Sequence, residues 1–344
     1  SMQLAHNQQR IKDDFYSIGG GLSNDQLSER IDFELQHSFS PFEDARLVWG
    51  LGSRLDRMRM PFWVGDNDDR TNVIYRIFGN LEWRFLNKFT MNLGALVEKN
   101  SFTDPDISPR FALNYHFSKQ QTFRFAVSRT SRMPALGEEH LDIRNTIPTL
   151  ITTRALSTHD LKPETAVTFE IGHHGSFFSN KLVTDMKLSR QRFRHLVNIP
   201  GVFFDPVTLE PILNYDNHSS ATSLNYELQL DYRPSHWTLF HFGYSWLKIS
   251  STSNAIQFNY QDSAPDHTIN FLASRKFTDG WRASIGYYYR SNMKYLRVTD
   301  DIGHYQRMDF VLQKTFKLSE RQKLKVAFIH QNSLGANHDF NAEN

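Results

Sequence analysis

The sequence predicts an all-β protein: an antiparallel transmembrane β-barrel, with about 14–16 strands visible, that forms part of a larger barrel. Two observations carry this prediction. Apolar residues recur at every second position along many segments, as they do in strands that have one apolar and one polar face. The connections between these segments are alternately short and long, as in barrels with short turns at one membrane surface and long loops at the other.

The composition of the 344 residues agrees with this fold class and excludes others. No segment approaches the ~18 consecutive apolar residues of a membrane helix. The formal net charge of +2 gives no basic surface for nucleic acid, and the absence of Cys excludes disulfides and thiolate chemistry. Mean hydropathy is −0.53 although 14% of the residues are aromatic. Alternating strands explain this combination, because only one of their faces is apolar.

Strands are expected from the first residues onward. A possible first strand lies near residues 10–18, and a clear alternation follows in which Ile31 and Phe33 flank a polar residue. Carboxylates on the polar faces, among them Asp32 and Glu227, are expected to line a lumen and to pair with Arg or Lys of neighbouring strands. The further strands are expected within residues 31–39, 47–51, 73–85, 89–97, 111–117, 123–127, 167–171, 182–188, 224–232, 240–246, 269–277, 281–289, 308–312 and 324–328.

Short and long connections alternate between these strands. Because transmembrane barrels have short periplasmic turns and long extracellular loops, we expect the short turns to face the periplasm and the long loops to face outside. Rings cluster at strand ends beside the short turns, as in the aromatic girdle at a membrane interface. A short helix is expected within residues 134–140 of the longest loop. Short turns are expected at 40–44, 86–88, 118–121, 175–180, 233–236, 278–280 and 317–322, and long loops at 58–69, 98–108, 130–160, 198–217, 249–264 and 291–304.

Five short motifs follow one another in the later two thirds of the chain. In order and spacing they resemble the barrel of TonB-dependent outer-membrane receptors, and together they are specific although each alone is weak. They are I-S-P-R-F-A-L-N-Y at 107–115, S-R-T-S-R-M-P-A-L-G-E at 128–138, L-K-P-E-T-A-V-T-F-E at 161–170, S-A-P-D-H-T at 263–268 and Y-Q-R-M-D-F at 305–310.

The resemblance implies a receptor, not an enzyme, that imports a scarce ligand such as a ferric siderophore across the outer membrane of a Gram-negative bacterium. Its partners would be outer-membrane lipid, a small-molecule ligand and the energy-coupling protein TonB, with no nucleic acid and no cofactor. Residues 1–344 are expected to form one barrel domain, a fragment or truncated form that lacks the N-terminal plug and the final strand of the family, whose barrels have about 22 strands. TonB would act through the missing plug segment.

Two other functions stay open at this point. Without a plug, the chain fits a passive or secretion pore of the outer membrane, similar to a porin. A structural or adhesive barrel without transport is the third alternative. A plug domain encoded upstream would distinguish the receptor from the pore.

The candidate ligand-binding residues are the aromatic residues Phe203, Phe204 and Tyr215. They lie in the long loop 198–217 outside any strand alternation, where exposed rings at the mouth of a barrel can stack on a ligand. The alternative is that these rings pack among the loops or belong to the outer girdle.

No catalytic residue and no metal ligand is assigned. The longest loop contains Glu138, Glu139, His140 and Asp142, which are close in sequence and of types that ligate metals, so a metal site there is an alternative to a purely structural loop. The acidic run at 66–69 offers oxygen atoms but lacks the spaced carboxylates and the Gly of a calcium loop. We interpret this run as a solvated loop tip.

Overall fold

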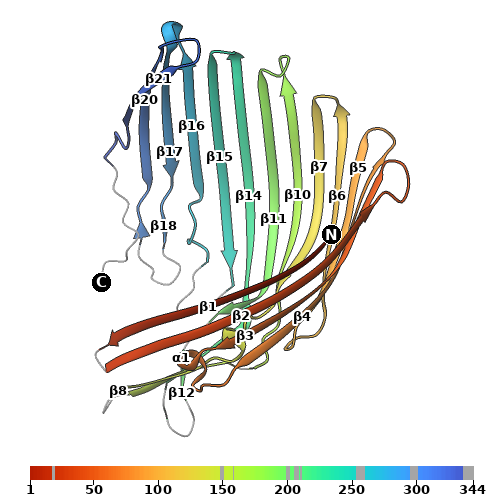
Figure 1. Cartoon of the computed structure of the whole chain (residues 1–344), viewed down its shortest axis with the longest axis vertical. Coiled ribbons are helices and arrows are strands. Elements are labelled where there is room, and N and C mark those ends of the chain that lie inside the picture. Colours follow the sequence, from red (N-terminus) through yellow and green to blue (C-terminus); the bar gives the residue numbers. More distant parts are fainter. Residues whose placement is uncertain are drawn as a thin grey trace.

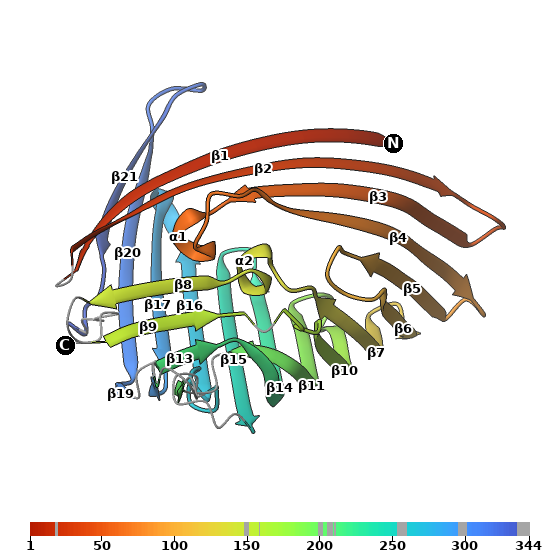
Figure 2. The ribbon, with the colours of Figure 1, turned by 90° about the horizontal axis from the view of Figure 1, so that it is seen from below.

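A computed structural model describes residues 1–17, 20–147, 151–157, 159–198, 202–204, 209, 211–252, 260–294 and 301–335. Most of these residues lie in strands, and 15 of the strands form one antiparallel sheet. Within this sheet each strand pairs with the strand that precedes it and the strand that follows it in chain order. The sheet is strongly curved and partly surrounds a concave interior (Figures 1 and 2).

The 15-stranded sheet confirms the predicted fold class. Its first strand is longer than the segment expected from the sequence, because backbone pairing with the next strand continues through residues that lack apolar alternation. The strands are β1 (Met2–Ser17), β2 (Gly20–Phe39), β3 (Ala45–Arg59), β4 (Arg70–Phe85), β5 (Phe89–Lys99), β6 (Asp106–Ser118), β7 (Gln121–Arg132), β10 (Glu164–Phe177), β11 (Leu182–Asn198), β14 (Asp216–Ser235), β15 (Thr238–Ser251), β16 (His267–Lys276), β17 (Trp281–Arg290), β20 (Tyr305–Lys317) and β21 (Lys323–His330).

The register of the sheet gathers apolar side chains on its outward, convex face. On adjacent strands Leu93 lies opposite Phe111, Phe111 opposite Val127, and Val127 opposite Phe169. Leu93 is 40% exposed and Phe169 is 53% exposed, whereas Phe111 and Val127 are half-buried. A continuous exposed apolar band is the surface that a barrel presents to lipid.

The concave face carries charged side chains that pair across strands. Lys187 Nζ lies 2.8 Å from Glu227 Oε2, and Arg54 Nε lies 3.9 Å from Asp32 Oδ2. The expectation that carboxylates of the polar face pair with bases of neighbouring strands is therefore confirmed at Asp32 and Glu227.

The two ends of the sheet differ as the loop lengths predict. One end has short turns, of which one contains the 3₁₀ turn η1 (Thr278–Gly280). The other end has long loops with further elements. These elements are α1 (Pro61–Val64), α2 (Leu136–Glu139), β8 (Asp142–Ile147), β9 (Ile151–Leu156), β12 (Val202–Phe204), β13 (Pro211–Asn214), β18 (Met293–Lys294) and β19 (Asp301–Ile302).

The helix expected in the longest loop is present as α2, whereas α1 was not expected. The sequence nonetheless contains start and stop signals for α1. Pro61 occupies the first turn, where its missing N–H costs nothing, and Gly65 ends the helix with φ of +74°. Neither helix, nor any other in the described ranges, has the length and apolar character needed to cross a membrane.

Candidate functional site

The long loops at one end of the sheet fold together. Loop 130–160 forms the hairpin β8–β9, and loop 198–217 forms the hairpin β12–β13. Because β13 pairs in parallel with β9, the two loops share one four-stranded sheet. Seen from the loop end, β8, β9, β13, α1 and α2 lie between the β1–β4 side of the wall and the β10–β15 side (Figure 2). We call α1, α2 and this small sheet the mouth cluster.

The mouth cluster has its own hydrophobic core. Met60, Val64 and Leu136 are each at most 4% exposed and pack together, with Phe102 against them. The ring of His140 meets the ring of Phe102 edge-on, with 5.4 Å between the centroids. Removal of these apolar groups from water holds α1 against α2, so the two helices are fixed although each has only four residues.

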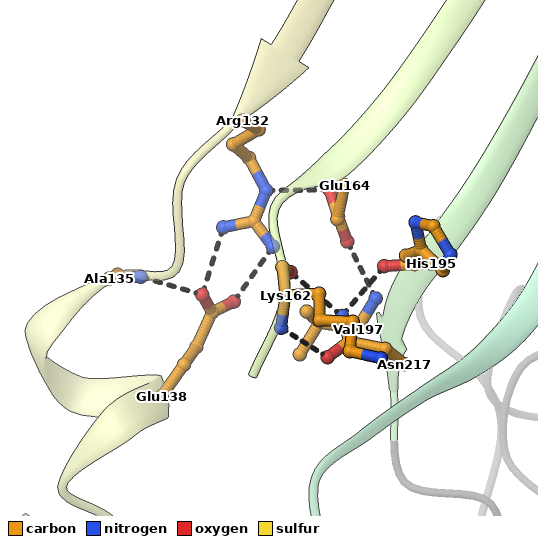
Figure 3. A network of polar contacts seen from close by, with 8 residues as sticks. All are labelled: Arg132, Ala135, Glu138, Lys162, Glu164, His195, Val197 and Asn217. Atoms are coloured by element: carbon orange, nitrogen blue, oxygen red, sulfur yellow. Dashed lines mark hydrogen bonds and ion pairs between the residues drawn. The ribbon is translucent and has the colours of Figure 1, made fainter. Parts of the chain in front are cut away.

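A charged network joins the mouth cluster to the wall, and Arg132 at the end of β7 is its centre (Figure 3). Its Nε donates to Glu164 Oε2 over 2.6 Å, and its Nη1 and Nη2 donate to the two carboxylate oxygens of Glu138 over 2.9 and 3.0 Å. Glu138 Oε2 also accepts the backbone N–H of Ala135 over 2.8 Å. One guanidinium thus ties β7 to both β10 and α2, with the paired geometry that Arg makes with carboxylates.

The network continues to the strands that flank loop 198–217 (Figure 3). The second oxygen of Glu164 accepts the backbone N–H of Val197 over 2.7 Å. The Asn217 side chain accepts the N–H of Lys162 over 2.7 Å and donates to the carbonyls of Lys162 and His195 over 3.0 and 2.8 Å. His195 has a φ of +56° at a register shift between β11 and β14. These bonds therefore fix an irregular strand end at the base of the loop.

A cavity of about 590 Å³ lies on the concave side between the wall and the segment 131–136. Its charges are largely paired, because Arg30 Nε lies 2.6 Å from Asp56 Oδ1 and Arg54 Nε lies 3.6 Å from Asp56 Oδ2. The buried Nε of Arg54 nevertheless makes no hydrogen bond within the described residues. The charged lining of the cavity consists of Glu29, Arg30, Arg54, Asp56, Glu98 and Arg132.

The residues weighed as metal ligands make other contacts. Glu138 binds Arg132, as described above. Asp66 Oδ1 accepts the N–H of Asp68 over 2.9 Å and Oδ2 accepts Arg70 Nη2 over 2.6 Å, and these bonds hold the pKa of Asp66 below its usual value. Throughout the part of the chain that the structure describes, no three His, Cys, Asp or Glu side chains lie close enough together to hold a metal ion.

Two titratable groups of the mouth cluster are shielded from water. Glu139 is 6% exposed, and its Oε2 has no hydrogen-bond partner among the described residues. Burial raises the pKa of Glu139, because it disfavours the carboxylate form. Burial also lowers the pKa of His140, and the nearby charge of Arg70 acts in the same direction. Both shifts are in the direction that disfavours the charged form.

The three candidate ligand-binding rings lie in or beside the β12–β13 hairpin. Phe203 and Phe204 belong to β12, a short strand within loop 198–217 that the sequence did not indicate and that forms by backbone pairing with β13. Phe204 is 66% exposed and lies opposite Pro211, whereas Tyr215 follows the far end of β13 and is half-buried. The Phe203 side chain lies outside the described part of the structure. The described contacts do not bring Phe204 and Tyr215 together.

Sequence reasoning did not single out Arg132, Glu164 or Asn217 as site residues. For Arg132 and Glu164, the sequence motifs contained a signal. Arg132 and Glu138 both stand in the motif at 128–138, and Glu164 stands in the motif at 161–170. The motifs that carry the family resemblance therefore supply the charges that fasten the mouth cluster. Asn217 lies in no motif, and its role depends on the folded strand end.

Comparisons with known proteins agree with the β-barrel fold described above. The family described as TonB dependent receptor-like, beta-barrel, matches residues 3–332. No curated protein matches the chain by sequence. Similar solved structures include a variant of the ferric enterobactin receptor PfeA from Pseudomonas aeruginosa, with a TM-score of 0.73 and 13% identity over 97% of this chain. The siderophore receptor PirA from Acinetobacter baumannii gives a TM-score of 0.68 and 14% identity over 95% of this chain.

A third similar structure is the copper transporter OprC, with a TM-score of 0.74 and 11% identity over 98% of this chain. At these identities the likeness shows the fold alone. The match covers 53% of the PfeA chain, 54% of the PirA chain and 57% of the OprC chain. This chain therefore spans about half the length of these receptors.

Proposed function

The chain belongs to the TonB-dependent receptor β-barrel family, and from this premise we propose that it serves in the TonB-dependent uptake of a small ligand across the outer membrane of a Gram-negative bacterium. Barrels of this family lie in that membrane, and the exposed apolar band of the wall suits contact with lipid. Two of the similar structures are siderophore receptors and one is a copper transporter. A ferric siderophore is therefore the ligand that we propose.

The mouth cluster is the observation that supports a receptor most strongly. It joins two long loops into one small sheet, has a buried core and is fastened to the wall by the Arg132 network. An open channel has no need for an ordered structure across its mouth. A receptor does need one, because rigid surfaces bind a ligand with a smaller loss of conformational freedom.

Within this mouth we propose that Phe203, Phe204 and Tyr215 contact the ligand. Exposed rings on a fixed hairpin offer faces for stacking on an aromatic or apolar ligand. Phe204 supports the proposal, because this residue is 66% exposed on the small sheet and so is accessible to a ligand. The bound ligand would pass from this hairpin toward the cavity beside Arg54.

The experiment measures binding and uptake of iron-55 as a ferric catecholate siderophore by cells that produce the full-length protein, with and without TonB. Phe203→Ala with Phe204→Ala is compared with Phe178→Ala, which removes a ring of 72% exposure from a short turn at the opposite end of the wall. We expect TonB-dependent uptake, and a loss of binding of about 1–3 kcal/mol in the double variant alone.

Two results would contradict the proposal in different ways. Equal binding by the double variant and the Phe178→Ala control would remove the rings from the ligand site. Uptake that persists without TonB, together with a large steady conductance of the full-length protein in planar bilayers, would instead support the passive or secretion pore.

A further inference from the structure

The outward face of β11 changes character along its length. Met186 and Leu188 continue the apolar band, but the next outward positions toward the loop end are Arg190, Arg192 and Arg194. All three guanidinium groups are exposed. Because side chains of a strand alternate between its faces, the three charges stand in one row on the same face as the lipid-facing residues before them.

Neighbouring strands extend this row into a groove. Arg190 lies opposite Phe169 and Arg192 opposite Val167 on β10, and Arg129 of β7 lies on the other side of Val167. Together with Lys162 these residues line a groove of about 560 Å³. The groove therefore combines an apolar floor with a basic rim. We call it the basic groove.

The positive charge of the basic groove is not compensated by the chain. Asp106 is the only carboxylate among its lining residues, and both of its oxygens bind Arg129, over 2.6 and 2.7 Å. Within the described residues, Arg190, Arg192 and Arg194 form no ion pair. A row of unpaired guanidinium groups is unfavourable because like charges repel, unless an anion lies between them.

The height of the row places it at a membrane surface. Leu182, at the short-turn end of β11, is ten positions from Arg192. At about 3.3 Å per residue this is about 33 Å of strand, and a tilt of about 40° reduces it to about 25 Å of height. The apolar band of a barrel is about 25 Å tall. Arg190 to Arg194 therefore lie where hydrocarbon gives way to lipid headgroups.

Outward-facing basic side chains near the short turns differ from those of the basic groove in their contacts. Lys314 Nζ lies 5.0 Å from the ring centroid of Trp281, and the Arg275 guanidinium lies 5.5 Å from that of Phe277. These cations lie over aromatic rings, whose faces attract positive charge. Only the basic groove presents several outward bases without a ring or a carboxylate for each, among the outward positions described here.

We propose that the basic groove binds a phosphate-bearing headgroup of an outer-leaflet lipid. Arg is suited to this ligand, because its planar guanidinium donates two parallel hydrogen bonds to a phosphate. The acyl chains of the same lipid would lie on Val167, Phe169 and Leu188. The groove faces away from the concave interior, so this site is separate from the one proposed for the transported ligand.

The experiment uses protein extracted from outer membranes in a neutral detergent and stripped of lipid. Native mass spectrometry measures retention of three probes: lipid A with its phosphates, the same lipid without phosphates, and inorganic phosphate. The triple variant Arg190→Gln, Arg192→Gln and Arg194→Gln is compared with the control Arg275→Gln and Lys314→Gln. We expect the triple variant to bind phosphorylated lipid A at least ten-fold more weakly, and the control to bind it as the parent protein does.

Equal affinity for the two lipids, or equal affinity of the triple variant and the parent protein, would overturn the proposal. Binding of inorganic phosphate as tight as that of phosphorylated lipid A would also overturn it, because the acyl chains would then contribute nothing. Arg192→Lys keeps the charge but not the paired hydrogen bonds, and we expect intermediate affinity from it. If the triple variant fails to fold, Arg192→Lys still tests the proposal. The proposed siderophore uptake does not depend on the basic groove, so none of these outcomes tests that function.

Discussion

The strand wall and the mouth cluster treat apolar side chains in opposite ways. The wall exposes its rings on the outward face, as at Phe169, and pairs charges across strands on the concave face, as at Lys187 and Glu227. The mouth cluster buries Met60, Val64 and Leu136 and holds its charges at its boundary, as at Arg132. One chain thus follows two rules of burial. The difference teaches that the two regions have the burial patterns expected of a surface that faces lipid and of one that faces water.

The largest effect is expected from a charge on the lipid face of the wall. Leu228 of β14 lies opposite Tyr244 and Met186 in the apolar band, whereas Gln229 faces the concave side. Leu228→Arg should lower the free energy of unfolding by about 2–4 kcal/mol, because the cation enters hydrocarbon. Gln229→Arg should cost far less. Refolding into lipid vesicles measures both, and equal losses would refute the assignment of the two faces.

A smaller, local effect is expected where the two regions join. Arg132→Ala should destabilise the mouth cluster by about 1–3 kcal/mol, because it leaves the partly buried carboxylates of Glu138 and Glu164 without their donor. The wall should keep its stability. Backbone hydrogen exchange within residues 133–147 reports the change.

The control for that variant is Arg57→Ala on β3. Arg57 lies 3.8 Å from Glu29 with most of its side chain in solvent, and an exposed pair of this kind contributes little. Similar exchange rates in the two variants would show that the Arg132 network does not hold the mouth cluster in place.

The smallest effect is a pH dependence within the mouth cluster. Burial raises the pKa of Glu139, so at pH 7 its carboxylate opposes folding, and this cost disappears as the pH falls and the group binds a proton. Glu139→Gln should therefore stabilise the mouth cluster by about 1 kcal/mol at pH 7. Well below the ordinary Glu pKa of about 4.3, where the carboxyl is neutral in both the folded and the unfolded state, the advantage should vanish. A gain that is independent of pH would contradict the assigned cause.

The wall could be predicted from the sequence far better than the mouth. Alternation at residues such as Ile31 and Phe33 reports the face of a strand directly, since a strand repeats every two residues. The pairing of β13 with β9 joins residues about 60 positions apart, and no local pattern encodes it. Phe204 was expected in a loop because the adjacent rings of Phe203 and Phe204 show no alternation, although their segment forms a short strand with β13. The role of Asn217 likewise depends on a carbonyl freed at the irregular strand end of His195.

The orientation of the wall in the membrane is the central claim, and cysteine labelling in intact cells tests it most directly. Asn67 lies in the long loop between β3 and β4, Lys119 in the short turn between β6 and β7, and both are exposed. The chain has no Cys, so Asn67→Cys and Lys119→Cys each introduce one thiol into it. We expect a membrane-impermeant maleimide to label Asn67→Cys in intact cells and Lys119→Cys only after lysis. Labelling of Lys119→Cys but not of Asn67→Cys in intact cells would contradict the account.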